Sequence, residues 1–177
     1  MTQLFFPFLQ NRHYFCVVFN LKTNVVEILD NMEHDGDIVD VYGFDIHILR
    51  SMVVQHLRNI GHPSTELIQT VEVSVIEMKW RTRDNFTDCG VFCMLHMETY
   101  MGGGSRGWHT GFTTEVPGQK KQIENLRMKY CTKILLSEQN SCKQVVEEEV
   151  ANLFSLSPST RSKFKTQAYV TRNFRLR

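Results

Sequence analysis

The sequence predicts one α+β domain in which helices pack on a small β-sheet, and three observations lead to this prediction. Residues 13–31 hold two apolar, β-branched runs around a short polar break, which is the pattern of a β-hairpin with mostly buried strands. Residues 44–60 and 88–101 carry apolar side chains at helical spacing. The chain of 177 residues is 42% hydrophobic, which is enough for one buried core.

The hairpin turn falls at residues 22–24, and the segments after it change type several times. Residues 32–43 are acidic and rich in turn formers, so we expect a loop there. The helix over 44–60 ends at the Gly-His-Pro sequence of residues 61–63. Residues 66–78 alternate valines with polar side chains, which predicts a strand with one buried face.

The helix over 88–101 carries apolar side chains on most of its sides, so we expect it to be central and buried. Three glycines follow it, and residues 102–118 predict a glycine-rich loop. Two more helices are expected within 119–154, on either side of residues 137–141. Together these elements make a predicted domain of residues 1–154.

Residues 155–177 differ from the rest of the chain in charge, with six Lys or Arg and no acidic residue. This composition predicts a basic, disordered and solvated tail. The alternative is a basic arm that contacts nucleic acid or an acidic partner.

Composition excludes several classes of protein. A net charge of +1 gives no overall field that would attract nucleic acid or an anionic membrane. The sequence has no apolar stretch of about 20 residues that would cross a bilayer, and its beginning lacks the features of a secretory signal. Five irregularly spaced cysteines argue for reduced thiols. We therefore expect an intracellular protein without a membrane partner.

Cys89 stands where the predicted helix over 88–101 begins. The unsatisfied amides and positive dipole end of a helix N-terminus stabilise a thiolate, and they can also donate to a developing oxyanion. Gly90 leaves room for a substrate to approach. The alternative reading is that Cys89 is a small buried hydrophobic residue.

His13 and Asp30 supply a base and a group to orient it. With the turn at 22–24, His13 falls opposite about residue 33 and Asp30 opposite about residue 16, so both lie at the open end of the hairpin. Asp30 can then accept from His13 Nδ1 and leave Nε2 for the thiol. The alternative is two strand-end residues with separate, solvated roles.

Three short motifs resemble, in the same order, the His, Asp and Cys boxes of the ubiquitin-like-protease family, the cysteine peptidases that process and deconjugate SUMO and related modifiers. They are His13-Tyr14, Ile28-Leu29-Asp30-Asn31 and Asp88-Cys89-Gly90-Val91-Phe92. The resemblance covers residues 4–100, with a softer likeness over 119–140 to plant, partly transposon-derived members. It implies a papain-like fold whose central helix packs on a small mixed sheet.

Two features depart from the family pattern. Family members have a glutamine six residues before the cysteine, whose amide completes the oxyanion hole, and Arg83 stands there in this chain. Losing one oxyanion donor lowers turnover on the order of 10² to 10³, so we expect a slow or inactive enzyme unless Arg83 donates instead. Asn85 is a weaker candidate donor. Family domains also hold more chain before the His strand, so we expect an N-terminally shortened domain.

Other functions stay open at this point. Cys89, Cys93 and His96 offer zinc ligands on one helix, but structural zinc sites usually take paired ligands from two segments. We therefore expect Cys93 in the core and His96 on the helix surface. A non-catalytic module that binds a ubiquitin-like modifier is favoured by Arg83 and by the short N-terminal part. A nucleic-acid-binding role would depend on the tail alone.

The resemblance implies a cysteine peptidase that hydrolyses the bond after the terminal glycine of SUMO or a related modifier. In that mechanism Cys89 is the nucleophile, His13 the base and Asp30 the residue that orients His13. No metal or organic cofactor is required. We expect a monomer without a nucleic-acid partner, and the family together with the basic tail points to the nucleus.

Overall fold

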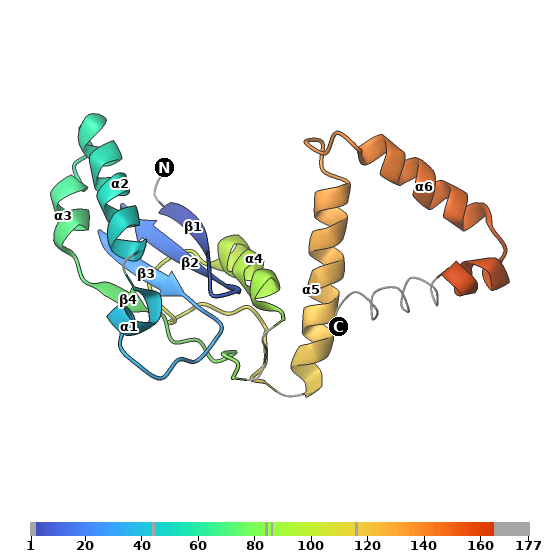
Figure 1. The fold of residues 1–177 in the computed structure, drawn as a ribbon, viewed down its shortest axis with the longest axis horizontal. Coiled ribbons are helices and arrows are strands. Elements are labelled where there is room, and N and C mark those ends of the chain that lie inside the picture. Colours follow the sequence, from blue (N-terminus) through green and yellow to red (C-terminus); the bar gives the residue numbers. More distant parts are fainter. Residues whose placement is uncertain (1–2, 44, 84, 86, 116, 165–177) are drawn as a thin grey trace. The chain divides into compact units, whose positions relative to one another are not determined.

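The computed structural model describes residues 3–43, 45–83, 85, 87–115 and 117–164. The chain divides into two compact units, Met1–Arg127 and Met128–Arg177. The elements are, in chain order, β1 (Gln3–Gln10), β2 (His13–Asn20), β3 (Val25–Leu29), α1 (Ile38–Tyr42), α2 (Asp45–Asn59), α3 (Thr65–Thr70), β4 (Val73–Val75), α4 (Cys89–Thr99), α5 (Pro117–Leu135) and α6 (Lys143–Ser155) (Figure 1).

The strands of the first unit form one mixed sheet in the order β1-β2-β3-β4. β2 pairs antiparallel with both β1 and β3, whereas β3 and β4 pair parallel. The hairpin predicted over residues 13–31 is confirmed as β2 and β3. A small mixed sheet with helices is therefore present, and the α+β class is confirmed.

The edge strand β1 has no counterpart among the sequence predictions. Asn11 and Arg12 form the two-residue turn that joins it to β2, and both have positive φ, 49° and 66°. Such angles are typical of tight hairpin turns, because they match the twist of the flanking strands. Pro7 is tolerated within β1 because an edge strand has one side without a sheet partner. The turn makes His13 the first residue of β2, opposite Gln10.

Helices cover β2 from both faces of the sheet (Figure 1). On one face Phe15, Val17 and Phe19 pack with buried side chains of α2. Cys16 points the other way and is also fully buried. On that side the Cys93 thiol of α4 lies 3.8 Å from the carbonyl oxygen of Phe15. Burial on both faces explains why the β2 sequence is continuously apolar and does not alternate.

Two predicted segments are wrong in part. The expected loop at 32–43 contains α1, which Asp37 caps by accepting from the Asp40 amide at 2.9 Å and which ends at Gly43 with φ 63°. The expected strand at 66–78 contains α3, and only β4 is extended. The valine alternation holds only from residue 71 onward. Ile68 is fully buried in the core that includes side chains of α2, so α3 packs against this core.

The central helix predicted over 88–101 is confirmed as α4, and Val91, Phe92 and Leu95 are buried as expected. His96 contradicts the prediction of a surface position, since it is 1% exposed. The indole Nε1 of Trp80 donates to His96 Nε2 at 3.4 Å. A ring nitrogen that accepts carries no hydrogen, so His96 is neutral in the fold.

Acid should weaken the fold through His96. Burial lowers the pKa of His96 to about 4, from 6.5 in an exposed chain. The unfolded chain therefore binds this proton first, and the stability contributed by neutral His96 is complete above about pH 6.5 and is lost as the pH falls toward 4. We expect the free energy of unfolding to fall by about 3 kcal/mol across this window, measured by urea denaturation.

His96→Gln is the matched variant, because it cannot titrate. Its unfolding free energy should change little between pH 6.5 and pH 4, and an identical pH dependence in both proteins would contradict the assignment. Asp30 acts in a different window. Its pKa is lowered in the fold, so its contribution is present above about pH 4 and is lost only below it.

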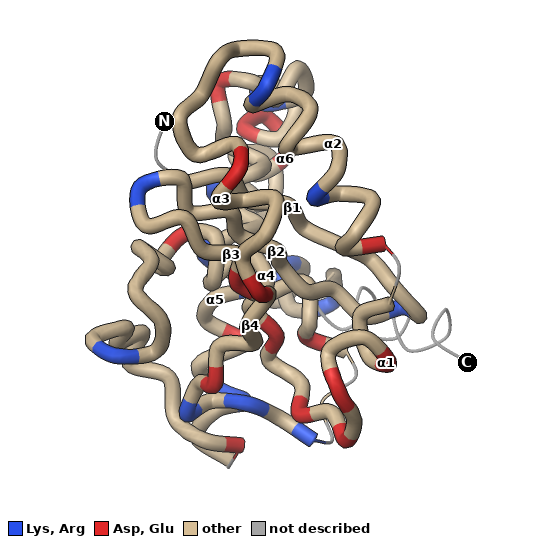
Figure 2. The backbone as a smooth tube through the Cα atoms, turned by 90° about the vertical axis from the view of Figure 1, so that its left-hand side faces the viewer, with Lys and Arg blue, Asp and Glu red and all other residues tan. Residues whose placement is uncertain are grey.

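The second unit contains the end of α5 and all of α6, as the prediction of two helices around 137–141 requires. Residues 158–164 are also helical. Residues 165–177 lie outside the described residues, so disorder of the tail stays a prediction. No helix among the described residues is long and apolar enough to cross a membrane. Lys and Arg are interspersed with Asp and Glu along the backbone (Figure 2).

Candidate active site

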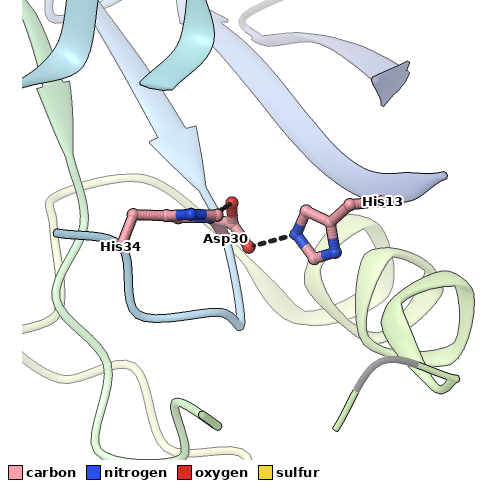
Figure 3. Close-up of side chains that lie close together, drawn as sticks. All are labelled: His13, Asp30 and His34. Atoms are coloured by element: carbon pink, nitrogen blue, oxygen red, sulfur yellow. Dashed lines mark hydrogen bonds and ion pairs between the residues drawn. The ribbon is translucent and has the colours of Figure 1, made fainter. Parts of the chain in front are cut away.

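Asp30 is the centre of the candidate site, and four donors reach its fully buried carboxylate. His13 Nε2 lies 2.7 Å from Oδ1, and His34 Nε2 lies 3.0 Å from Oδ2 (Figure 3). The Tyr42 hydroxyl donates to Oδ2 at 3.1 Å, and the Met32 amide donates to Oδ1 at 2.8 Å. Two donors on each oxygen satisfy the buried charge.

These contacts keep Asp30 ionised. Burial by itself would raise the pKa of the Asp30 carboxyl, but the hydrogen bonds from His13 and His34 outweigh burial and hold that pKa well below its usual range. Burial, followed by the neighbouring Asp30 charge, raises the pKa of the Tyr42 hydroxyl. Tyr42 therefore stays protonated and continues to donate.

The prediction that Asp30 bonds to Nδ1 of His13 is wrong, because Nε2 makes this bond. The register explains the difference. Cys16 pairs with Leu29, so the next pair outward is Phe15 with Asp30, and His13 lies two residues further along β2. Since an ionised carboxylate only accepts, Nε2 carries the hydrogen, and Nδ1 keeps the lone pair that can take a proton.

Cys89 begins α4, as predicted, and its thiol lies against the β1–β2 turn that precedes His13. Its thiol lies 4.0 Å from the main-chain carbonyl oxygen of Arg12, the residue before His13. A Cβ on Gly90 would lie 3.8 Å from the Tyr14 ring, so α4 starts directly beside the start of β2. The start of α4, which carries Cys89, thus lies beside the start of β2, where His13 contacts Asp30.

Asp88, the residue before Cys89, is held by two side chains. Arg127 of α5 forms an ion pair with Asp88 Oδ1 through Nη2. Asn85 Nδ2 donates to Asp88 Oδ2 at 2.9 Å, and Asn85 Oδ1 accepts from the Asp88 amide at 3.1 Å. The Asn85 amide is therefore committed to the loop before α4. Its predicted alternative role as an oxyanion donor is not supported by these contacts.

The Arg127–Asp88 pair should assist Cys89 by neutralising a carboxylate beside the thiolate. In Arg127→Met the charge of Asp88 is left to oppose the thiolate one residue away. We expect the rate of Cys89 alkylation by iodoacetamide at pH 7 to fall roughly tenfold. Mass spectrometry of the Cys89 peptide reports this rate without any substrate.

Removing the charge of Asp88 as well provides the control for the Arg127→Met variant. Asp88→Asn in the Arg127→Met background should restore most of the rate, and Arg127→Lys should keep it. A rate that stays low in the double variant would show that Arg127 acts through the fold and not through charge.

Arg83 lies on the Asp30 side of the site. The amide of Thr82 donates to the Asn31 carbonyl oxygen at 2.6 Å, which lays this segment along the chain that follows β3. There the Arg83 guanidinium pairs with Glu33, and the Arg83 amide donates to Glu115 Oε2 at 2.6 Å. The Arg83 side chain is 79% exposed. Both of these contacts join Arg83 to carboxylates, those of Glu33 and Glu115.

The two possible metal ligand sets differ in geometry. Cys93 contacts β2 and His96 accepts from Trp80, so the zinc ligands considered from sequence have separate partners. His13, Asp30 and His34 offer ligand atoms that lie within 4.8 Å of one another. However, both imidazoles bond directly to the carboxylate at 2.7 and 3.0 Å. A zinc ion about 2.0 to 2.2 Å from each ligand does not fit between atoms this close.

Sequence reasoning missed His34, Tyr42 and Arg127. His34 and Tyr42 lie in the segment expected to be a loop, and nothing in their spacing links them to Asp30. The capping signal of Asp37 and Gly43 could have located α1, and with it Tyr42. Arg127 meets Asp88 across a separation that no local pattern encodes.

Comparisons with known proteins find solved structures of SUMO proteases at low identity. No family model and no curated protein matches the chain. The C-terminal Ulp1 protease domain in complex with Smt3, the yeast ortholog of SUMO, aligns at 14% identity with a TM-score of 0.32, covering 55% of this chain and 40% of that chain. A de-sumoylating protease aligns at 13% identity with a TM-score of 0.44, covering 94% of this chain and 64% of that chain. This chain therefore spans less than two thirds of either structure.

Proposed function

We propose that this chain is a cysteine peptidase that hydrolyses the bond after the terminal glycine of SUMO or a related ubiquitin-like modifier. The observation that supports peptidase chemistry is that ionised Asp30 holds His13 through Nε2 at the start of β2, while the thiol of Cys89, at the N-terminus of α4, lies 4.0 Å from the carbonyl oxygen of the preceding residue, Arg12. The substrate class follows from the resemblance of the three sequence motifs to the ubiquitin-like-protease family, here of the plant, transposon-associated type.

Acylation begins with transfer of the Cys89 thiol proton to Nδ1 of His13. The thiolate attacks the carbonyl carbon of the terminal glycine, and the carbonyl π electrons move to its oxygen. The amide of Cys89, at the start of α4, is suited to stabilise this oxyanion because the first amides of a helix have no partner within it. His13 then gives its proton to the leaving amine, the C–N bond breaks, and an acyl-enzyme remains.

Deacylation reverses the roles. His13 Nδ1 takes a proton from water, the hydroxide attacks the thioester, and the modifier leaves with a free carboxylate while Cys89 regains its proton. Asp30 stabilises the imidazolium that forms in both stages, because its carboxylate accepts from Nε2 throughout. His34 and Tyr42 hold Asp30 in place from the other oxygen.

A SUMO vinyl-sulfone probe tests the proposal, because it forms a covalent adduct only with a thiolate that reaches the terminal glycine. We expect an adduct that is lost in Cys89→Ser and retained in Cys131→Ser, a variant of an exposed free cysteine. Adduct formation that survives Cys89→Ser would rule out Cys89 as the nucleophile. No adduct with any ubiquitin-like probe would rule out the peptidase.

The second candidate is a non-catalytic module that binds the same modifier. The observation in its favour is Arg83, which stands where the family has its oxyanion glutamine and pairs with Glu33. Binding of unmodified SUMO together with no adduct would identify this module. We also propose a monomer in the nucleus, on the basis of the family resemblance and the basic tail.

A further inference from the structure

His34 and Tyr42, the two residues that contact Oδ2 of Asp30, also line a cavity of about 690 Å³. The proposed reaction of Cys89 and His13 does not use this cavity. Its walls come from α1 and the turn before it, from β4, and from the segment that follows β4. The lining residues are His34, Gly36, Asp37, Ile38, Val39, Val41, Tyr42, Val73, Ser74, Val75 and Arg81.

Arg81 lines this pocket, and its side chain has no acidic partner among the described residues. Its Nε is buried and has no hydrogen-bond partner, and no ion pair joins it to an acid among residues 3–43, 45–83, 85, 87–115 and 117–164. Arg81 and Tyr42 line the same cavity. A guanidinium that is partly buried and unpaired is suited to bind a carboxylate.

The other ionisable groups of the pocket are already engaged. Asp37 accepts from the Asp40 amide and caps α1. His34 donates to Asp30 through Nε2. The pocket thus presents the guanidinium of Arg81 to a ligand, and apolar side chains of α1 and β4 line it together with Ser74 and the capping carboxylate of Asp37.

β4 contributes the second recognition feature, because it is an edge strand. It pairs with β3 on one side and ends the sheet on the other. Val73 and Val75 are half buried in the pocket wall, and Ser74 between them is exposed. An edge strand can add an extended peptide through main-chain hydrogen bonds, while neighbouring pockets select its side chains.

We propose that this pocket binds an extended peptide segment that carries an acidic side chain. The peptide backbone pairs with β4, its apolar side chains contact the valines of β4 and α1, and its carboxylate pairs with Arg81. The site does not use Cys89, and it stands whether or not the chain is a peptidase.

Fluorescence anisotropy with two rhodamine-labelled peptides tests the site without any turnover. The sequences Ser-Val-Ser-Asp-Ser-Val-Ser and Ser-Val-Ser-Asn-Ser-Val-Ser place both valines and the central side chain on one face of an extended strand, and they differ only in the charge of the central side chain. We expect the acidic peptide to bind the full chain at least tenfold more tightly than the amide peptide. Methylation of the two valine nitrogens should weaken the acidic peptide to a similar degree, because it removes main-chain donors.

Variants of Arg81 test whether this residue binds the carboxylate of the peptide. Arg81→Met should reduce the preference for the acidic peptide to less than twofold, and Arg81→Lys should retain part of it. Arg106→Met removes the same charge from an exposed arginine outside this pocket and should keep the full preference. Equal binding of the two peptides, an unchanged preference in Arg81→Met, or an equal loss in Arg106→Met would each overturn the proposal. Unchanged binding of the methylated peptide would overturn strand pairing.

Discussion

Asp30→Ala is expected to lower kcat/KM on a SUMO substrate by on the order of 10³ to 10⁴, because it removes the group that fixes His13. Without the carboxylate, Nε2 of His13 has no acceptor at 2.7 Å, so the orientation and the tautomer of the imidazole are no longer fixed. The same change leaves three further donors facing a cavity. An unsatisfied buried donor costs about 1 to 3 kcal/mol, so the protein should also unfold at lower urea concentration.

Asp30→Asn separates orientation from charge. Its amide oxygen can take the place of Oδ1 and accept from His13, and its NH₂ group can face Tyr42 and His34, each of which is able to accept. We expect a smaller loss of activity than in Asp30→Ala and a smaller loss of stability. If folded Asp30→Ala keeps its rate within tenfold of the parent, Asp30 does not orient the base.

Arg83→Gln is expected to raise kcat/KM by on the order of 10², because it restores a neutral amide donor at the position of the family's oxyanion glutamine. In the parent, Glu33 binds the guanidinium at the surface. Glutamine carries no charge for Glu33 to hold, and its shorter side chain has less conformational entropy to lose on turning toward Cys89.

Two variants show whether a gain comes from this position. Glu33→Gln removes the ion pair but keeps Arg83, so it reports what the arginine does without that partner. Arg106→Gln makes the same chemical change at an exposed arginine and should leave the rate unchanged. Equal rates for the parent and Arg83→Gln would mean that residue 83 does not contribute to the oxyanion site.

Local patterns predicted the parts of the fold that are set by local physics. The apolar runs on either side of residues 22–24 gave the β2–β3 hairpin, because β-branched side chains separated by a short polar break have few other stable arrangements. Helical spacing gave α2 and α4 to within two residues at each end. α3 was missed because Ile68 is drawn into a core formed by α2 and the sheet, and that contact overrides a weak strand pattern.

The sequence by itself proposed the three residues of the candidate site. Spacing places His13, Asp30 and Cys89 at the ends of predicted elements, and the resemblance of their motifs to the ubiquitin-like-protease family selects them as a set. Only the tertiary structure decided which atoms of these residues form hydrogen bonds and with which partners. A one-residue difference in register assigned Nε2 of His13 to Asp30, and the fold brought His34 and Tyr42 to the second carboxylate oxygen. It also turned Arg83 toward Glu33 and left Arg81 facing a pocket. Such contacts join side chains from separate elements, so their distances depend on how the elements pack and not on spacing along the chain.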